Sequence, residues 1–480
     1  MTRRPGLTLF ACAAVTSASF VPIALPRAAA ASNPPPARLQ TPVLSLRRAP
    51  ELLVRAVGVG HLSAELDAAL SDPTLGLARN NLCIDVRQGA TTLYSRNPAE
   101  MLIPASNLKL LTATAAIDKL GPGDRLVTVV SAGRPPAAGE VTGDLYLVGG
   151  GDPLLRTASY VASLPYRELI YSHLDTLARQ VKAAGVTHVT GGVIGDESRY
   201  DQQRYVPSWR PSYQTTGEVG PLSALSVNDG FVAVGPPPVP SQDPAQDAAA
   251  TFTGLLKAEG VAVDGSPGAG VAPASARTIT SMPSPPMADL LAEAVLRQSD
   301  NDGAELITKE IGRQVAGAAM TTAGVAAIRA DLQADGLPVD QLSAVDGSGL
   351  DRSDRASCQL IMAALQRSGP DGLLGRGLPV AGRTGTLEDR FVGTPVAGRL
   401  EAKTGTLDGV SALSGFVVAP AGSPVAPAGE LTFSMIVNSL PSKATGEALE
   451  DRVGAILARF PEAPSVTDMK PLPVAPASSG

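Results

Sequence analysis

Apolar positions recur with helical spacing in several stretches of the chain and follow a strand-like pattern in others. The clearest helical stretch follows Pro104, where Leu108, Leu111 and Ala115 share one face and Gly121 ends the pattern. Further helices are expected over residues 61–70, 166–184, 248–259, 286–297, 303–315, 321–336, 352–366 and 446–460. Strands are expected over residues 82–86, 91–94, 126–130, 143–148, 189–194, 399–403, 411–418 and 431–437. The pattern therefore predicts a protein that mixes helices and strands.

The order of these elements predicts an α/β (α+β) domain that is interrupted by a second one. Predicted strands lie at both ends of the domain and helices fill its middle, which favours one antiparallel sheet flanked by helices. We expect residues 51–123 and 278–460 to form this domain, and residues 124–277 to form an inserted α+β domain.

Size and charge exclude some classes of function. With 480 residues and 44% hydrophobic content, the chain is long enough for more than one core. The net charge is −6 and no basic run is present, so nucleic acid is not an expected partner.

The N-terminus has the pattern of an export signal. Arg3 and Arg4 precede a mostly apolar stretch over residues 7–23, and four alanines at residues 28–31 supply a cleavage region. We expect a signal peptide over 1–31, a Pro/Ala-rich linker over 32–50 and a Pro-rich tail over 461–480. The mature protein is expected to be periplasmic or extracellular and associated with the cell wall, with no stable membrane span.

Two cysteines, Cys83 and Cys358, remain after the predicted signal peptide. An even count in an exported protein permits one disulfide, whereas the alternative is two buried thiols. Our hypothesis is that the two are joined.

Ser106 and Lys109 form the first candidate for chemistry, because they stand at the start of the apolar helix after Pro104. Residues i and i+3 of a helix lie about 5–6 Å apart between Cβ atoms, so the two side chains face each other. A serine hydroxyl becomes a nucleophile when a base takes its proton, and a buried lysine can act as that base. Ser-x-x-Lys alone is a weak motif, and on most helices it marks a solvated polar face.

Ser299-Asp300-Asn301 is the second motif. Ser299 suits a proton relay toward a leaving amine, and Asn301 offers both a donor and an acceptor for a substrate amide.

The third motif is Lys403-Thr404-Gly405-Thr406, at the end of a predicted strand. Lys403 offers a cation for a substrate carboxylate, and Gly405 permits close approach of the backbone. The N–H groups of Ser106 and Thr406 would form an oxyanion hole. A similar run, residues 383–386, lacks a clear preceding strand, so we prefer the later copy.

Together and in this order, the three motifs resemble those of the class C low-molecular-mass penicillin-binding proteins, the D-alanyl-D-alanine carboxypeptidase/endopeptidase family. The resemblance covers roughly residues 75–460 and includes runs at 143–147, 149–153, 224–228, 346–350 and 393–395. It implies the penicillin-binding/β-lactamase-like transpeptidase fold, with the insertion between the first two motifs. The chain departs from the family at Asp351, where the family normally has a small residue.

The resemblance implies a serine-type D-Ala-D-Ala carboxypeptidase, with possible endopeptidase action, that cleaves peptidoglycan stem peptides through an acyl-Ser106 intermediate. Catalysis is assigned to Ser106, Lys109, Ser299 and Asn301, and substrate binding to residues 403–406. β-Lactams would be covalent inhibitors, and no cofactor or metal is expected. Two alternatives stay open, a serine β-lactamase and a non-catalytic cell-wall binding protein. The first is disfavoured because no Asn follows a Glu by four residues, as class A enzymes require.

Overall fold

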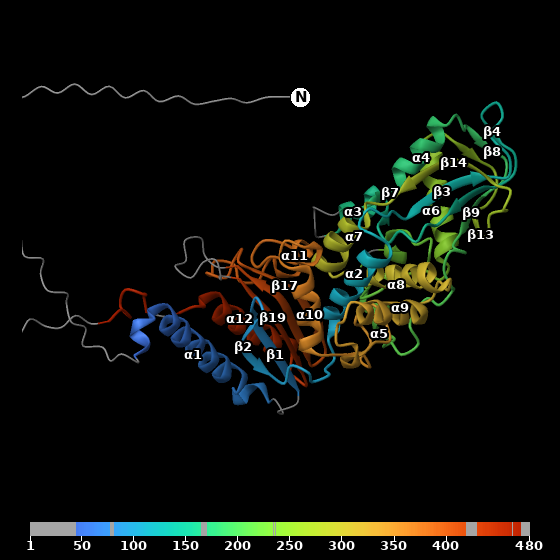
Figure 1. Cartoon of the computed structure of the whole chain (residues 1–480). Coiled ribbons are helices and arrows are strands. Elements are labelled where there is room, and N and C mark those ends of the chain that lie inside the picture. The colour runs from blue at the N-terminus through green and yellow to red at the C-terminus, as the bar shows by residue number, and fades with distance from the viewer. Residues whose placement is uncertain are drawn as a thin grey trace, which may run out of the picture.

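The computed structural model describes residues 45–76, 81–164, 170–233, 235, 237–418, 430–462 and 464–471. The predicted signal peptide lies outside the described residues, as do most of the predicted linker and about half of the predicted tail. The molecule is elongated and has one sheet near each end, with a group of helices between them (Figure 1). Within the described part, no helix has the length and apolarity that a membrane span needs.

The first sheet is antiparallel and has the strand order β17-β18-β19-β1-β2. Its strands are β1 (Leu82–Gln88), β2 (Thr91–Arg96), β17 (Leu400–Leu407), β18 (Val410–Val417) and β19 (Leu431–Asn438). Every residue of β18 and β19 is buried, because helices cover both faces of the sheet. Helices α1 (Pro50–Leu70) and α12 (Lys443–Arg459) pack together on one face, and α10 (Cys358–Ser368) packs on the other.

Helix α2 (Leu108–Lys119) is the centre of the helical layer, and all its residues from Leu108 to Ala116 are buried. It follows a 3₁₀ turn, η3 (Ala105–Asn107), and packs against α8 (Asn301–Ala316), α9 (Thr321–Ala334) and α10. Helix α7 (Met287–Leu290), the π-helical segment Leu291–Arg297 and α11 (Leu373–Gly377) complete the layer. This layer and the first sheet hold the three motifs.

The second sheet has the order β13-β9-β5-β3-β14 and its own apolar cluster. Its strands are β3 (Val127–Ala132), β5 (Leu145–Val148), β9 (Val193–Asp196), β13 (Gly268–Ala269) and β14 (Arg277–Pro283). Helices α4 (Leu174–Ala183) and α6 (Pro244–Ala258) pack with it, and a small sheet joins β4 (Glu140–Val141), β8 (His188–Val189) and β12 (Ala262–Val263). Because β14 pairs with β3 as far as Pro283, we call residues 124–283 the insertion.

The remaining elements are short. They are η1 (Leu46–Arg48), η2 (Pro73–Leu75), β6 (Leu155–Arg156), α3 (Ala158–Ser163), β7 (Ser172–His173), α5 (Ser212–Thr216), η4 (Asn228–Gly230), β10 (Phe231–Ala233), β11 (Val239–Pro240), η6 (Val339–Gln341), β15 (Leu342–Ser343), β16 (Arg355–Ala356) and η7 (Gly385–Leu387).

Several element boundaries differ from those that the sequence predicts. Helix α1 begins at Pro50 rather than at residue 61, since a proline is compatible with the first turn. The helix expected from residue 352 begins at Cys358, because Ser357 caps it by accepting from the Leu360 N–H. The helix expected from residue 166 begins at Leu174, and residues 165–169 lie outside the described part.

A disulfide joins Cys83 of β1 to Cys358 at the start of α10, across 275 residues of sequence. This confirms the predicted pairing. The bond ties the first sheet to the helical layer, near the strand that leads toward α2.

Candidate active site

Ser106 lies in the η3 turn immediately before α2, and Lys109 lies one turn further on. The Lys109 Nζ is 3.0 Å from the Ser106 Oγ. Ala105, just before the serine, has a φ of 47°, a conformation that is unusual for a residue other than glycine. The structure therefore brings the two residues of the first motif into contact, on a tight turn rather than within regular helix.

Lys109 is fully buried and has two further partners. Its Nζ donates to Asn301 Oδ1 at 2.6 Å and to the Ser348 carbonyl oxygen at 2.8 Å. Burial lowers the pKa of Lys109 to about 8, although the carboxylates of Asp346 and Glu305 oppose the change. A substantial neutral fraction near physiological pH gives this lysine the ability to act as a base.

Ser299 of the second motif contacts Lys403 of the third. Lys403 Nζ donates to Ser299 Oγ at 2.7 Å and to the Thr404 carbonyl oxygen at 2.9 Å. Ser299 has a φ of 60°, which is an unfavourable backbone conformation for a residue other than glycine. The contacts around this turn must therefore stabilise it. Burial, together with the charge of Lys109, holds the pKa of Lys403 well below its usual value.

Asn301 connects Lys109 with the insertion. Its Oδ1 accepts from Lys109, while its Nδ2 donates to the backbone carbonyl of Glu218 at 2.6 Å. The second bond fixes the orientation of the amide, because the donor and the acceptor of the side chain now have separate partners. A residue of the insertion thus helps to present Asn301.

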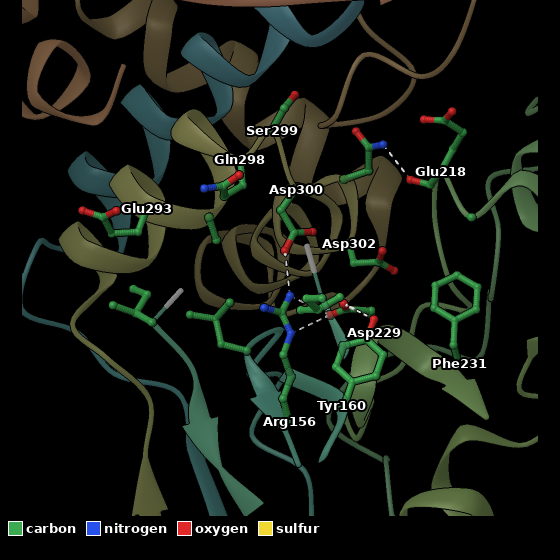
Figure 2. Close-up of a pocket in the computed structure, with 16 residues that line it drawn as sticks. Arg156, Tyr160, Glu218, Asp229, Phe231, Glu293, Gln298, Ser299, Asp300 and Asp302 are labelled. Atoms are coloured by element: carbon green, nitrogen blue, oxygen red, sulfur yellow. Dashed lines mark hydrogen bonds and ion pairs between the residues drawn. The ribbon is translucent and has the colours of Figure 1, made fainter. Parts of the chain in front are cut away.

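Asp300, the middle residue of the second motif, points away from Ser299 and toward the insertion (Figure 2). Its carboxylate caps α8 through the Gly303 N–H at 2.9 Å and lies 3.5 Å from Arg156. Arg156 also pairs with Asp229 at 2.8 Å, and Tyr160 donates to Asp229 at 2.7 Å. Burial raises the pKa of Asp300, and the nearby Asp229 charge adds to the effect. Asp300 therefore anchors the turn that carries Ser299.

These anchoring side chains line a cavity of about 370 Å³ beneath the turn. Figure 2 shows that it lies between the Ser299 turn and the insertion, with Phe231 and Glu218 along one side.

Gly405 allows β17 to approach Ser106 closely. A Cβ at this position would lie 2.9 Å from the Pro104 carbonyl oxygen and 3.2 Å from the Ser106 nitrogen. Any side chain would therefore push the strand away from the turn that carries Ser106.

β17 is the terminal strand of the first sheet, so among the described residues no further strand lies along its outer edge. The Ala402 N–H points outward and donates to Pro379 at 2.9 Å. Backbone groups of a strand alternate between its two sides, so the N–H groups of Thr404 and Thr406 also point outward. Thr406 is thereby placed to supply the second N–H of an oxyanion hole beside Ser106.

The loop of residues 346–350 contacts Lys109, a contact that the sequence did not predict. It supplies the Ser348 carbonyl that accepts from Lys109. Glu305 Oε1 accepts from the N–H groups of Gly347 and Ser348 at 2.9 and 2.7 Å, and Asp346 Oδ1 accepts from Gly349 at 2.7 Å. Burial raises the pKa of Glu305 to about 8.

Asp351, where the chain departs from the family pattern, stabilises the same loop. Its carboxylate accepts from the Ser208 hydroxyl and from the Ser353 N–H. Its N–H donates to Asp346 Oδ2 at 2.8 Å, which also accepts from Trp209 at 2.8 Å. Asp351 thus adds a hydrogen bond between the 346–350 loop region and Ser208 of the insertion, and its backbone N–H still bonds to Asp346 of the loop.

Among the described residues, the acidic group with the spacing to hold a metal ion is Asp118, Asp331 and Asp335. It lies at the far end of α2 and α9 from Ser106, and Lys119 and Arg367 pair with it. It contributes nothing to the site of the three motifs.

Comparisons with known proteins identify the family of this chain. The model of the D-Ala-D-Ala carboxypeptidase 3 (S13) family matches residues 62–238 and 236–460. The chain belongs to this family. It is 30% identical to a D-alanyl-D-alanine carboxypeptidase of Actinomadura sp., over 83% of this chain and 85% of that protein. It is also 30% identical to a carboxypeptidase of Mycobacterium tuberculosis, over 78% of this chain and 79% of that protein.

The fold also resembles a solved structure, penicillin binding protein 4 from Haemophilus influenzae. The TM-score is 0.67 at 20% identity, and the match covers 81% of this chain and 98% of that chain. The predicted family and the predicted α+β fold with an antiparallel sheet and helices are both confirmed.

Proposed function

We propose that this family member is a serine-type D-Ala-D-Ala carboxypeptidase that acts on peptidoglycan stem peptides through an acyl-Ser106 intermediate. The observation that carries the proposal is the buried Lys109, whose Nζ lies 3.0 Å from Ser106 Oγ and whose pKa is lowered to about 8. Nucleophile and base are in contact, and burial favours the neutral form of the base.

Neutral Lys109 has two N–H bonds and one lone pair. The N–H bonds are directed at Asn301 Oδ1 and the Ser348 carbonyl, which leaves the lone pair to accept the Ser106 proton. Asn301, Ser348 and Ser106 thus orient the Lys109 amine so that its lone pair faces the Ser106 hydroxyl, as a general base requires.

Acylation then follows from the placement of the groups. Ser106 Oγ attacks the carbonyl carbon of the penultimate D-Ala while its proton passes to Lys109, and the N–H groups of Ser106 and Thr406 stabilise the oxyanion. The C–N bond breaks, the amine takes up the proton by way of Ser299, and D-Ala leaves. In deacylation Lys109 accepts a proton from water, which attacks the acyl carbon, and returns that proton to Ser106 as the ester bond breaks.

The two buried lysines couple substrate binding to base function. Two ammonium ions in one site repel each other, so one of them is favoured in the neutral form. A substrate carboxylate beside Lys403 stabilises the ammonium on that residue. The proton is then disfavoured on Lys109, which becomes the base when substrate is bound.

We also propose that the chain is exported to the cell wall. The support is the Cys83–Cys358 disulfide, because such bonds persist in oxidising compartments and are rare in the cytosol.

Labelling with a fluorescent penicillin tests the proposal. The wild-type protein should be labelled and should release D-Ala from a pentapeptide. Ser106→Ala should lose both activities while keeping its melting temperature, whereas Ser198→Ala, on an exposed part of the insertion, should keep both. Full labelling of Ser106→Ala would show that another residue is the nucleophile.

A further inference from the structure

The run of residues 383–386, which resembles the Lys403 motif, lies directly beside it. Residues 379–381 run along the outer edge of β17, where Ala402 N–H donates to Pro379 and Ala381 N–H donates to Leu400, both at 2.9 Å. The chain then turns through η7 (Gly385–Leu387). The first half of the β17 edge is therefore covered, and the open edge starts at the third motif.

This turn bridges the two walls of the active site. A Cβ at Gly385 would lie 2.4 Å from the Arg297 carbonyl oxygen, two residues before Ser299. On the other side, Thr386 Oγ1 lies 2.7 Å from Thr404 Oγ1. The turn thus closes the end of the cleft at which Ser299 and Lys403 meet.

The two threonine hydroxyls offer a donor at this closed end. Each hydroxyl has one proton, and a single hydrogen bond between them uses only one of the two. The other O–H is free to donate, and the Thr386 side chain is exposed, so an incoming group can reach it. Lys403 Nζ lies nearby, since it donates to the Thr404 carbonyl oxygen at 2.9 Å. A hydroxyl donor beside a lysine is a suitable site for a carboxylate oxygen.

We propose that Thr386 is a substrate-binding residue, which together with Thr404 recognises the terminal carboxylate of the D-amino acid beyond the scissile bond. The inference rests on the proposed peptidase function and adds a recognition group to it. Arg383 of the same run does not take this role. Its guanidinium lies beside Gly398, where a Cβ would be 2.3 Å from the Arg383 Cζ.

The test compares two substrates that differ only at the terminal carboxylate, one free and one amidated. Thr386→Val keeps the shape of the side chain and removes the hydroxyl. We expect kcat/KM on the free acid to fall roughly tenfold, because a hydrogen bond to a charged group is lost. On the amide, the same variant should match wild type within about twofold. Thr386→Ser should retain activity on the free acid, and Thr142→Val, an exposed threonine of the insertion, should change neither rate.

Equal losses on both substrates, or no loss on either, would overturn the role of Thr386. A second measurement uses acylation of Ser106 by a penicillin and by its methyl ester, with the same variants and the same expected selectivity. Because it reports on the carboxylate without peptide cleavage, it separates the two proposals. If Thr386→Val loses acylation by the penicillin but not by its methyl ester, while the wild-type protein never releases D-Ala, the peptidase function is refuted and the role of Thr386 is supported.

Discussion

The lowered pKa of Lys109 predicts the pH dependence of acylation. At pH 7 a lysine with a pKa of about 8 is roughly one-tenth neutral, whereas one at the ordinary value of 10.5 is about 0.03% neutral. Burial therefore increases the available base roughly 300-fold at this pH. The second-order rate constant for acylation by a fluorescent penicillin should rise about tenfold per pH unit below pH 8 and level off above it.

Stopped-flow labelling between about pH 5.5 and pH 10 measures this profile directly. A rate that does not change between about pH 6 and pH 9, or a midpoint near the ordinary lysine value, would refute the assignment of a buried neutral base.

Asn301→Asp gives a second, independent perturbation of the same group. It places a carboxylate where Asn301 Oδ1 now lies, 2.6 Å from the Lys109 Nζ. An adjacent opposite charge favours the ammonium form, so the midpoint should move up by more than about one unit, and acylation at pH 7 should fall about tenfold or more. Gln333→Glu adds the same charge on the exposed face of α9 and should leave the midpoint unchanged. A midpoint that stays in place in Asn301→Asp would contradict the electrostatic argument.

Three further predictions follow from packing and charge. Gly405→Ala should fold but be acylated roughly a hundredfold more slowly, because the added Cβ would displace β17 from Ser106. A melting curve tests the folding, and the rate of penicillin labelling tests the acylation. Replacing both Cys83 and Cys358 by Ser should lower the free energy of unfolding by roughly 4–5 kcal/mol in urea titrations. The raised pKa of Glu305 means that its contribution to stability is present below pH 4.5 and is lost as the pH rises through about 8. The melting temperature of Glu305→Gln should therefore rise relative to that of wild type as the pH increases across that window. A difference in melting temperature that does not change with pH would contradict the raised pKa of Glu305.

The parts of the site that sequence predicts are those set by local geometry. Ser106 and Lys109 meet because they lie one turn apart, and Lys403 is placed by a strand whose partner follows closely in the chain. Sequence did not predict that Ser106 lies on a 3₁₀ turn after a residue with positive φ. That conformation depends on a distant loop, because Gly349 packs so closely that a Cβ there would lie 1.9 Å from the Ala105 carbonyl oxygen.

The contacts that two other residues make with the site could not be predicted from their side chains. Glu218 and Ser348 act through their backbone carbonyls, which every residue type possesses. Glu305 did leave a signal, since an acidic residue flanked by Ala304 and Leu306 in an apolar helix indicates a buried partner. Its partners lie about 40 residues further on, at the N–H groups of the 346–350 loop, and only the folded chain identifies them.

The position of β1 between β2 and β19 has a consequence for synthesis of the protein. The sheet of the insertion is complete once Pro283 has emerged from the ribosome or a membrane channel, whereas the first sheet lacks its central strand until Leu431–Asn438 appears. Pairing between such distant segments is slow, because a long loop must close before the contacts form. The nascent chain should therefore present a folded insertion while the β1–β2 hairpin still exposes an apolar face that is open to aggregation or to chaperone binding. Penicillin labelling should appear only as the last strand is added.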